Sequence, residues 1–291
     1  MNNFPNPYRT MDDKPWPMGK KPARKDAVQF KFTNYFSKRE LPTPPKVFGP
    51  WRHFDDMHMY DNHKVGNCVF AGAANETESF FYDVGRDVEF TTENVISDYT
   101  ALTGYDPKKD FDPGSDMSDA AKYRRTVGIV DDKGKRHKID AYVRLSSGNY
   151  NDLKIAMYLF GVVGIGLIMP DFAQPDFKKK KTWNVKKGKH DVAGGHYVSG
   201  CGINEKGEIV IMTWGRYHTM TKKFYEKYND ESTGYFSVER LVNSTSPEGF
   251  KAESLIADLK SLKKPFGYSG YTLAFNRLEG KKELDKKKLI A

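Results

Sequence analysis

The sequence is poor in cysteine and has no long apolar run. Only Cys68 and Cys201 occur in 291 residues, too few for the disulfide framework of a small secreted domain. No apolar segment approaches the roughly 18 residues that a membrane-spanning helix needs. The opening segment, MNNFPNPYRTMDDK, lacks the apolar stretch of a signal peptide. We therefore expect a soluble protein that is not secreted by a signal peptide and does not depend on disulfides.

Acidic residues are outnumbered, with 38 Asp and Glu against 47 Lys and Arg and a formal net charge of +9. Much of the excess lies in three short runs, Lys178–Lys181, Lys186–Lys189 and Lys286–Lys288. A groove for single-stranded nucleic acid combines basic residues with stacking aromatics, but only Trp183 lies inside the central run. The pattern favours a solvated lysine-rich loop, and a nucleic-acid partner is not expected.

Proline is unevenly distributed, with nine of the 15 prolines in the first 50 residues. That segment shows no helical period, yet it contains more large aromatic residues than a disordered tail would. We interpret residues 1–50 as an extended arm that packs onto its own domain or onto a neighbouring subunit. Residues 51–275 are expected to form the globular domain, and residues 276–291 a basic tail.

The spacing of apolar residues predicts helices first and antiparallel strands later. The helical part covers about 51–130 and the strand-rich part about 136–275, which is an α+β layout rather than alternating βαβ units. The clearest hairpin joins strands 196–203 and 208–214 through the turn 204–207. The other predicted elements are helices over 67–82, 92–104 (capped by Thr92), 117–126, 151–161 and from Pro247 to Leu262, and strands over 139–145, 162–169, 235–238 (an edge strand) and 271–275.

Cys68 stands at the start of the first predicted helix, in the stretch VGNCVFAGAANETESFF. An unperturbed thiol is mostly protonated at neutral pH, but the unpaired N–H groups and the macrodipole of a helix N-terminus favour the thiolate. Gly66 allows a close approach of the backbone, and Asn67 is a reasonable N-cap. Two interpretations follow from this position, an activated nucleophile or a small apolar residue in the core.

A nucleophilic cysteine is activated by a histidine that takes its proton. Six of the seven histidines lie among polar or loop-like neighbours, and only His196, in GGHYVSG, enters a predicted strand. It follows Cys68 by 128 residues. A structural histidine at the start of a strand is the alternative.

Taken together, these positions resemble the papain-like cysteine peptidases. In that family a cysteine opens the central helix, a Gly-His pair follows roughly 130–150 residues later, and a Trp-Gly pair comes one hairpin after the histidine. The matching residues are Gly66-Asn67-Cys68, Gly195-His196 and Trp214-Gly215, and the strand VVGIGLIM precedes the histidine as in the family. The resemblance implies a helical N-terminal subdomain, with its central helix starting at the cysteine, packed on an antiparallel sheet or barrel.

A narrower resemblance is to papain-like proteins encoded in phage and prophage genomes. It rests on the segments GNCVFAGAANE, DYTALTGYDP, YRRTVGIVD, YLFGVVGIG, GGHYVSGCG and MTWGR. This resemblance implies a location in a virion or in the host cytoplasm. It also implies phage structural proteins, or a second copy of the chain, as partners of the arm.

Carried over residue by residue, the family resemblance makes Cys68 the nucleophile and His196 the general base. Asn62 stands where the family has a glutamine that helps to bind the oxyanion, and it has the same amide donors on a shorter stem. Trp214 matches the indole that shields the histidine from water.

Met212 departs from the family's pattern. The family places an asparagine two residues before the tryptophan, where it orients the imidazole, and methionine accepts a hydrogen bond poorly. Alternation along a strand puts Met212 and Trp214 on one face. We therefore expect Thr213 to point away from the histidine.

Other candidate sites are weaker. The three histidines at positions 53, 58 and 63 miss the i, i+4 spacing of a zinc-binding helix and lack a completing ligand, so no metal site is expected. Gly164-Ile165-Gly166 lacks the third glycine of a dinucleotide-binding loop, and no cofactor is expected. Cys201 is predicted to be a core residue of a strand.

Two functions remain open from the sequence. The first is a cysteine peptidase or amidase that acts through an acyl-enzyme on a peptide or on a peptide crosslink of the cell wall. The second is a catalytically weak or silent structural or binding protein of a virion, which uses its arm for subunit contacts. An open cleft between Cys68 and His196 is expected for the enzyme, and a cleft filled by the arm or by side chains for the scaffold.

Overall fold

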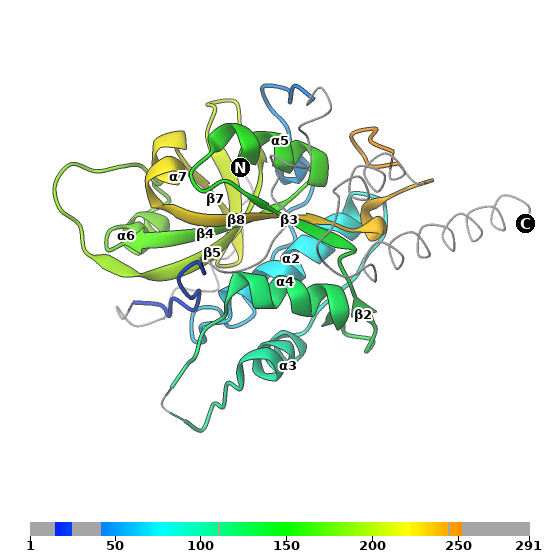
Figure 1. Ribbon diagram of the computed structural model, residues 1–291, viewed down its shortest axis with the longest axis horizontal. Helices are drawn as coiled ribbons and strands as arrows, with labels where there is room; N and C mark the ends of the chain where they lie inside the picture. Colours follow the sequence, from blue (N-terminus) through cyan, green and yellow to red (C-terminus); the bar gives the residue numbers. More distant parts are fainter. Residues whose placement is uncertain (1–14, 25–41, 110, 244, 252–291) are drawn as a thin grey trace, which may run out of the picture.

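The computed structural model describes residues 15–24, 42–109, 111–243 and 245–251, and these form a helical part packed against a sheet (Figure 1). A short 3-10 helix, η1 (Pro50–Arg52), precedes the helical part. That part comprises α2 (Cys68–Tyr82), α3 (Thr92–Thr103) and α4 (Met117–Thr126), with a two-stranded sheet of β1 (Ile129–Val130) and β2 (Arg136–His137) beside them.

The main sheet contains six antiparallel strands in the order β3-β8-β4-β5-β6-β7. Helices α5 and α7 lie over one face of this sheet and α2 lies against the other (Figure 1). The elements of this part are β3 (Ala141–Leu145), α5 (Tyr150–Phe160), β4 (Val163–Pro170), α6 (Ala173–Lys178), β5 (Val192–Ile203), β6 (Ile209–Thr213), β7 (Arg216–Met220), α7 (Lys222–Tyr228), β8 (Asn229–Phe236) and η2 (Val238–Arg240). The arrangement confirms the predicted α+β fold class.

Polar caps and glycine ends set the bounds of the helices. Asp116 and Asn149 accept backbone N–H bonds from the first turns of α4 and α5. Thr91 caps α3, so the predicted cap Thr92 is wrong by one residue and is the first helical residue instead. Gly104, in the left-handed region with φ 71°, ends α3. The four helices predicted between residues 67 and 161 are confirmed.

The hairpin β5–β6 is confirmed, and its turn is closed by a bond from the Asn204 N–H to the Glu208 carbonyl. The predicted edge strand 235–238 is wrong, because β8 is twice as long and lies between β3 and β4 inside the sheet. Its polar residues 231–233 are buried, so the alternation of apolar residues that predicts a strand is present only at the C-terminal end of β8. Residues 247–249 form a turn; the rest of the predicted helix, the strand 271–275 and the basic tail lie outside the described residues.

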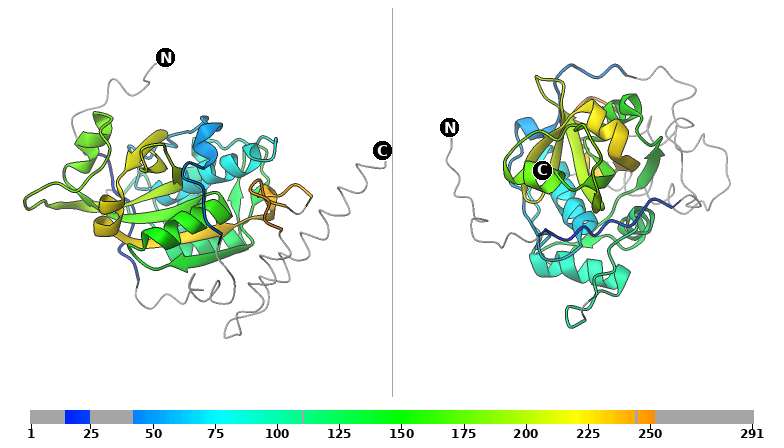
Figure 2. Two further views of the ribbon diagram at one scale, coloured as in Figure 1. Left: turned by 90° about the horizontal axis from the view of Figure 1, so that it is seen from above. Right: turned by 90° about the vertical axis from the view of Figure 1, so that its left-hand side faces the viewer.

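Two pieces of the predicted arm pack on the same chain. Residues 15–24 run along the boundary between the helical part and the sheet (Figure 2, right), and Phe48 pairs with Ile203 at the far end of β5. Trp183, in the middle of the lysine-rich loop, is buried against α6 and is not available to stack on a base. Among the described residues, no helix has the length and apolar character of a membrane span.

Candidate active site

Cys68 is the first residue of α2, and its side chain is 2% exposed. Burial raises the pKa of the thiol to about 11, and the backbone N–H groups of Tyr197 and Gly19 and the charge of Lys20 oppose that rise. Asn67 occupies the N-cap position as predicted, but its side chain makes no capping hydrogen bond. The helix terminus is therefore in place, but burial has the larger effect on the pKa of the thiol.

His196 lies on β5 and is fully buried. Its Nε2 shares a hydrogen bond of 2.8 Å with the hydroxyl of Thr213, while Nδ1 is enclosed and has no partner among the described residues. The indole of Trp214 stacks on the imidazole, with 4.2 Å between the ring centroids and 18° between the planes. Burial lowers the pKa of His196 to about 3, so the ring is neutral at neutral pH.

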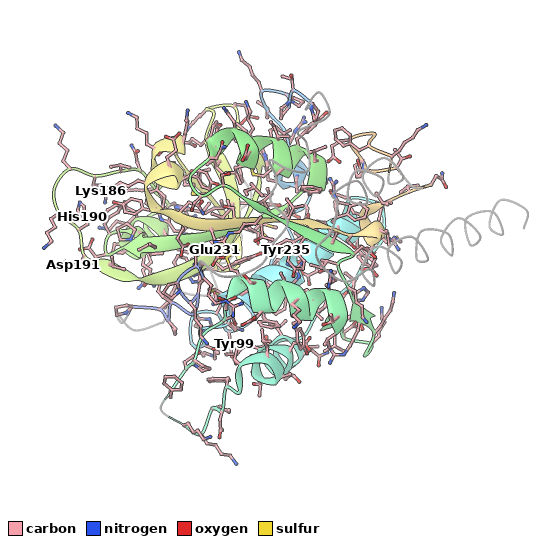
Figure 3. All side chains as sticks on the ribbon, in the orientation of Figure 1. Tyr99, Lys186, His190, Asp191, Glu231 and Tyr235 are labelled. Carbon is pink, nitrogen blue, oxygen red and sulfur yellow. The ribbon has the colours of Figure 1, made fainter. Side chains whose placement is uncertain are left out.

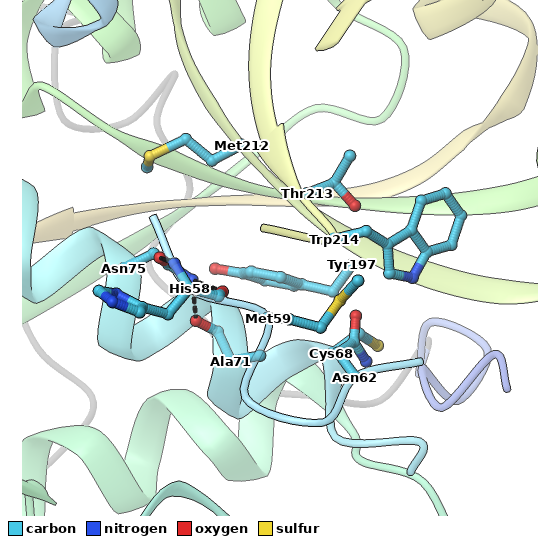
Figure 4. A pocket seen from close by; sticks show the side chains of 11 residues that line it. His58, Met59, Asn62, Cys68, Ala71, Asn75, Tyr197, Met212, Thr213 and Trp214 are labelled. Carbon is cyan, nitrogen blue, oxygen red and sulfur yellow. Dashed lines mark hydrogen bonds between the residues drawn. The ribbon is translucent and has the colours of Figure 1, made fainter. Parts of the chain in front are cut away.

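Thr213, not Met212, contacts the histidine, and the predicted direction of Thr213 is wrong. Met212 pairs in register with Ser199, three residues beyond His196 on β5. Because side chains alternate along a strand, Met212 shares the face of Ser199, and continuing the register places Thr213 on the face of His196. Figure 4 shows Met212 pointing away from Thr213 and Trp214. Met212 packs instead in an apolar cluster that includes Cys201, which is buried as predicted.

Asn62 lines the same small pocket, of about 20 Å³, as Cys68 (Figure 4). Its amide Nδ2 donates to Asn67 Oδ1 at 3.2 Å and, more weakly, to the Val65 carbonyl at 3.4 Å. Two residues with positive φ, Tyr60 and Asp61, fold the chain back just before it. The Asn67 side chain donates to the Tyr60 carbonyl and so supports this turn. The pocket has room for about one water molecule.

A buried polar cluster that sequence reasoning missed joins α2 to the sheet. Glu76, two turns after Cys68, accepts hydrogen bonds from the Tyr197 hydroxyl at 2.5 Å and the Ser199 hydroxyl at 2.7 Å. Its other oxygen accepts from Arg124 on α4 at 2.6 Å. The Tyr197 ring crosses α2 at Gly72, where a Cβ would lie 2.4 Å from the ring. The cluster fixes the strand of His196 against the helix of Cys68.

The segment of residues 15–24 covers this site. Gly19 pairs with Gly195, the residue before His196, and Lys20 pairs with Ser115, both as parallel β-bridges. A Cβ on Gly19 would lie 1.6 Å from the Gly66 carbonyl oxygen, so only glycine can pass there. Trp16 packs edge-on against Trp214 with ring centroids 5.3 Å apart. The space beside Cys68 is therefore occupied by a piece of the predicted arm.

No protein-family model matches the sequence, and no curated protein matches it. Similar solved structures exist, however. Xylellain, a cysteine protease from Xylella fastidiosa, is 14% identical and superposes with a TM-score of 0.60 over 79% of this chain and 100% of its own. Procathepsin L2 from the larval midgut of Tenebrio molitor is 15% identical, with a TM-score of 0.53 over 73% of this chain and 74% of its own. A procathepsin B from Trypanosoma congolense is 14% identical, with a TM-score of 0.51 over 74% of this chain and 85% of its own. At these identities the likeness establishes the fold, which is that of the papain-like cysteine proteases.

Proposed function

We propose that the protein is a cysteine peptidase of the papain-like type whose cleft is closed by its own residues 15–24. In the open state the Cys68 thiol transfers its proton to His196 and the thiolate attacks a peptide carbonyl. The C–N bond breaks as the imidazolium protonates the leaving amine, and water then hydrolyses the thioester. Cys68 and His196 are both restored at the end of the cycle.

The observation that carries this proposal is the extended peptide already lying over the thiol. The Gly19 N–H is near enough to Cys68 to lower the pKa of its thiol, the Lys20 N–H donates to the Gly195 carbonyl at 2.9 Å, and the Ser115 N–H donates to the Gly19 carbonyl at 2.6 Å. Main-chain hydrogen bonds of this kind are how a cleft binds an extended peptide of any sequence. A filled cleft was expected to favour a scaffold. The main-chain bonds of residues 19 and 20 next to a thiol nevertheless support a peptidase that binds an extended peptide in the same way.

The remaining residues of the site receive roles that fit their contacts. Thr213 bonds to Nε2 of His196 and Nδ1 has no partner among the described residues. In the proposed open state Nδ1 is the nitrogen that exchanges a proton with the thiol. Trp214 keeps water from the imidazole. Asn62 and the Cys68 backbone N–H supply donors for the oxyanion, which requires the Asn62 amide to exchange its weak bond to Val65 for the substrate oxygen.

Selective labelling of Cys68 in the full chain tests the proposal. Cys201 is the internal control, because it is a second buried thiol whose S–H donates to the Val210 carbonyl in the core. We expect a peptidyl epoxide to label Cys68 at pH 6–7 and iodoacetamide to label it faster than Cys201, more so once Lys20 is replaced by Ala. Equal and slow labelling of the two cysteines in both chains would refute a catalytic thiol.

A second function is favoured by one specific observation, the neutral form of both Cys68 and His196 in the closed cleft. In this version the protein is a silent structural or binding protein of a phage particle, with residues 15–24 a permanent part of its fold. The resemblance of its motifs to phage and prophage proteins supports a virion-associated location for either function. Mass spectrometry of purified particles tests that location, and absence of the chain from the particle would refute it.

A further inference from the structure

The side chain of Lys20 is fully buried in an acidic pocket beside the site. Its Nζ is 2.6 Å from Asp230 Oδ2 and 3.1 Å from Glu231 Oε1, and it donates to the Lys21 carbonyl at 2.9 Å. We propose that this pocket is the specificity site of the cleft and that it selects an extended peptide with lysine or arginine next to the residue whose carbonyl Cys68 attacks. This inference rests on the proposed peptidase function and names its substrate class.

The position of the pocket follows from the backbone of the segment. Gly19 lies against the sulfur of Cys68 and Lys20 is the next residue, held by Gly195 on one side and Ser115 on the other. Both bridges use main-chain atoms only, so they hold any sequence equally well. Residue 20 is thus the residue next to Gly19, and its side chain has charged partners in the cleft.

The shape of the pocket matches a long, thin side chain. Gly166 on β4 forms its floor, and a Cβ there would lie 2.2 Å from the Lys20 Cε. The register pairs Gly166 with Glu231 across β4 and β8, which sets the carboxylate at the inner end. A residue other than glycine at position 166 would close the channel that leads the ammonium group to the acids.

The charges of the pocket require a cation. Glu231, labelled near the middle of the molecule in Figure 3, is buried, and burial raises the pKa of its carboxyl while Lys20 and Arg144 lower it. Arg144 is 3.7 Å from the far oxygen of Glu231 and offsets part of the charge. When residues 15–24 leave the cleft, Asp230 and Glu231 are left with one cation between them in a desolvated place, which is unfavourable. A basic substrate side chain restores the balance.

The pocket has spare acceptors for arginine as well as lysine. Asp230 Oδ1 accepts no hydrogen bond among the described residues, and Glu231 Oε1 has only its ion pair with Lys20. A guanidinium presents a fork of donors that suits two carboxylates better than a single ammonium does. The pairs on the lysine-rich loop, such as Lys186 with Asp176, differ because that lysine is 42% exposed and water can replace its partner.

The first experiment replaces Lys20 in the full chain and follows alkylation of Cys68 by iodoacetamide. Lys20→Met keeps the length of the side chain and removes the charge, Lys20→Arg keeps the charge, and Lys21→Met is the matched control because Lys21 is exposed beside it. We expect alkylation to rise about tenfold or more in Lys20→Met and to stay unchanged in Lys20→Arg and Lys21→Met. Equal rates in Lys20→Met and the wild type would overturn the proposal.

The second experiment adds the peptide PWPMGKKPAR, which is residues 15–24, to the Lys20→Met chain, and compares it with the same peptide carrying norleucine for the first lysine. The lysine peptide is expected to protect Cys68 from alkylation at a concentration about tenfold lower, and Glu231→Gln in the chain is expected to abolish that difference. Glu226→Gln, at an exposed glutamate of α7, is the control and should leave the difference intact. Equal protection by the two peptides, or none by either, would count against the pocket.

A peptide library digested by the wild-type chain separates this inference from the proposed function. Lysine or arginine enriched at one position next to the attacked residue supports both, and cleavage without that enrichment overturns the pocket as a specificity site. A chain that is selectively protected by the lysine peptide but cleaves nothing refutes the peptidase and keeps the binding pocket.

Discussion

Replacing Thr213 by valine tests whether its hydroxyl orients the histidine. Valine has nearly the same shape, so the change removes one hydrogen bond of 2.8 Å and leaves Nε2 of His196 buried without a partner. An unpaired buried polar group costs about 1–3 kcal/mol. If that cost falls on the arrangement in which the imidazole accepts the thiol proton, the rate falls about 5- to 150-fold, at 1.4 kcal/mol for each factor of ten.

The assay for this variant is the rate of Cys68 alkylation at pH 6.5, together with peptide cleavage where it is found. Thr213→Ser keeps the hydroxyl and should restore the rate. Thr219→Val is the matched control on the neighbouring strand. It removes one partly buried hydroxyl and with it the hydrogen bond of 2.7 Å between Thr219 and Thr182. Equal thermal stability of the two valine variants would exclude a general loss of structure.

Nitrogen NMR of the His196 ring gives a readout that does not depend on turnover. A hydroxyl that accepts from Nε2–H favours the tautomer with a bare Nδ1, which is the form that can accept a proton from Cys68. Thr213→Val should remove that preference and shift both ring nitrogens. A Thr213→Val chain with unchanged ring shifts and an unchanged alkylation rate would refute the role given to Thr213.

Three further perturbations have expected outcomes. Gly19→Ala places a Cβ 1.6 Å from a backbone oxygen, so the segment should lift and alkylation of Cys68 at pH 8 should rise about tenfold or more; an unchanged rate would contradict the closed cleft. Glu76→Gln should lower the unfolding free energy in urea by about 3–5 kcal/mol, because it leaves Arg124 as a buried charge without an ionised partner. Glu78 is buried beside the Tyr60 hydroxyl, and burial raises its pKa from 4.5 to about 8. The folded state therefore holds a proton that the unfolded state releases, so stability should fall between pH 4.5 and 8 by at most about 1.4 kcal/mol per pH unit. Glu78→Gln should flatten that slope in thermal melts, and a slope equal to that of the wild type would exclude Glu78 as its cause.

Local patterns were enough to predict most of the elements. The helices at 92–103 and 117–126 follow from apolar spacing and from polar residues in position to cap them. The long central strand β8 was missed because its first half is polar and yet buried. Its environment comes from β3 and β4 on either side, which are far away in the sequence.

Site residues were predictable where the local sequence sets their position. They were not predictable where the position depends on how two strands pair. Cys68 begins its helix as predicted, and Asn62 lies in the same pocket. The partner of His196 depends on the register between β5 and β6, which spacing along one strand cannot give. The hydrogen-bonded ion pair between Lys20 and Asp230 joins residues 210 positions apart, and the local sequence around neither residue predicts it.

The two proposed functions also differ in how far the pKa values of Cys68 and His196 should move when residues 15–24 leave the site. Burial is the largest cause of both pKa shifts. It raises the pKa of the Cys68 thiol to about 11 and lowers the pKa of the His196 imidazole to about 3. At pH 7 that leaves about one thiolate in ten thousand. Lifting residues 15–24 takes away the Gly19 N–H and the Lys20 charge, which favour the thiolate, but it also readmits water, which favours both charged forms. Because burial is the larger effect, the thiol pKa should fall and the imidazole pKa should rise in Gly19→Ala. For a peptidase the two changes must go far enough that an ion pair exists at neutral pH, so that Cys68 reacts over a plateau between two pKa values. A silent scaffold would instead show alkylation that rises steadily with pH toward the pKa of an ordinary thiol, with no dependence on His196.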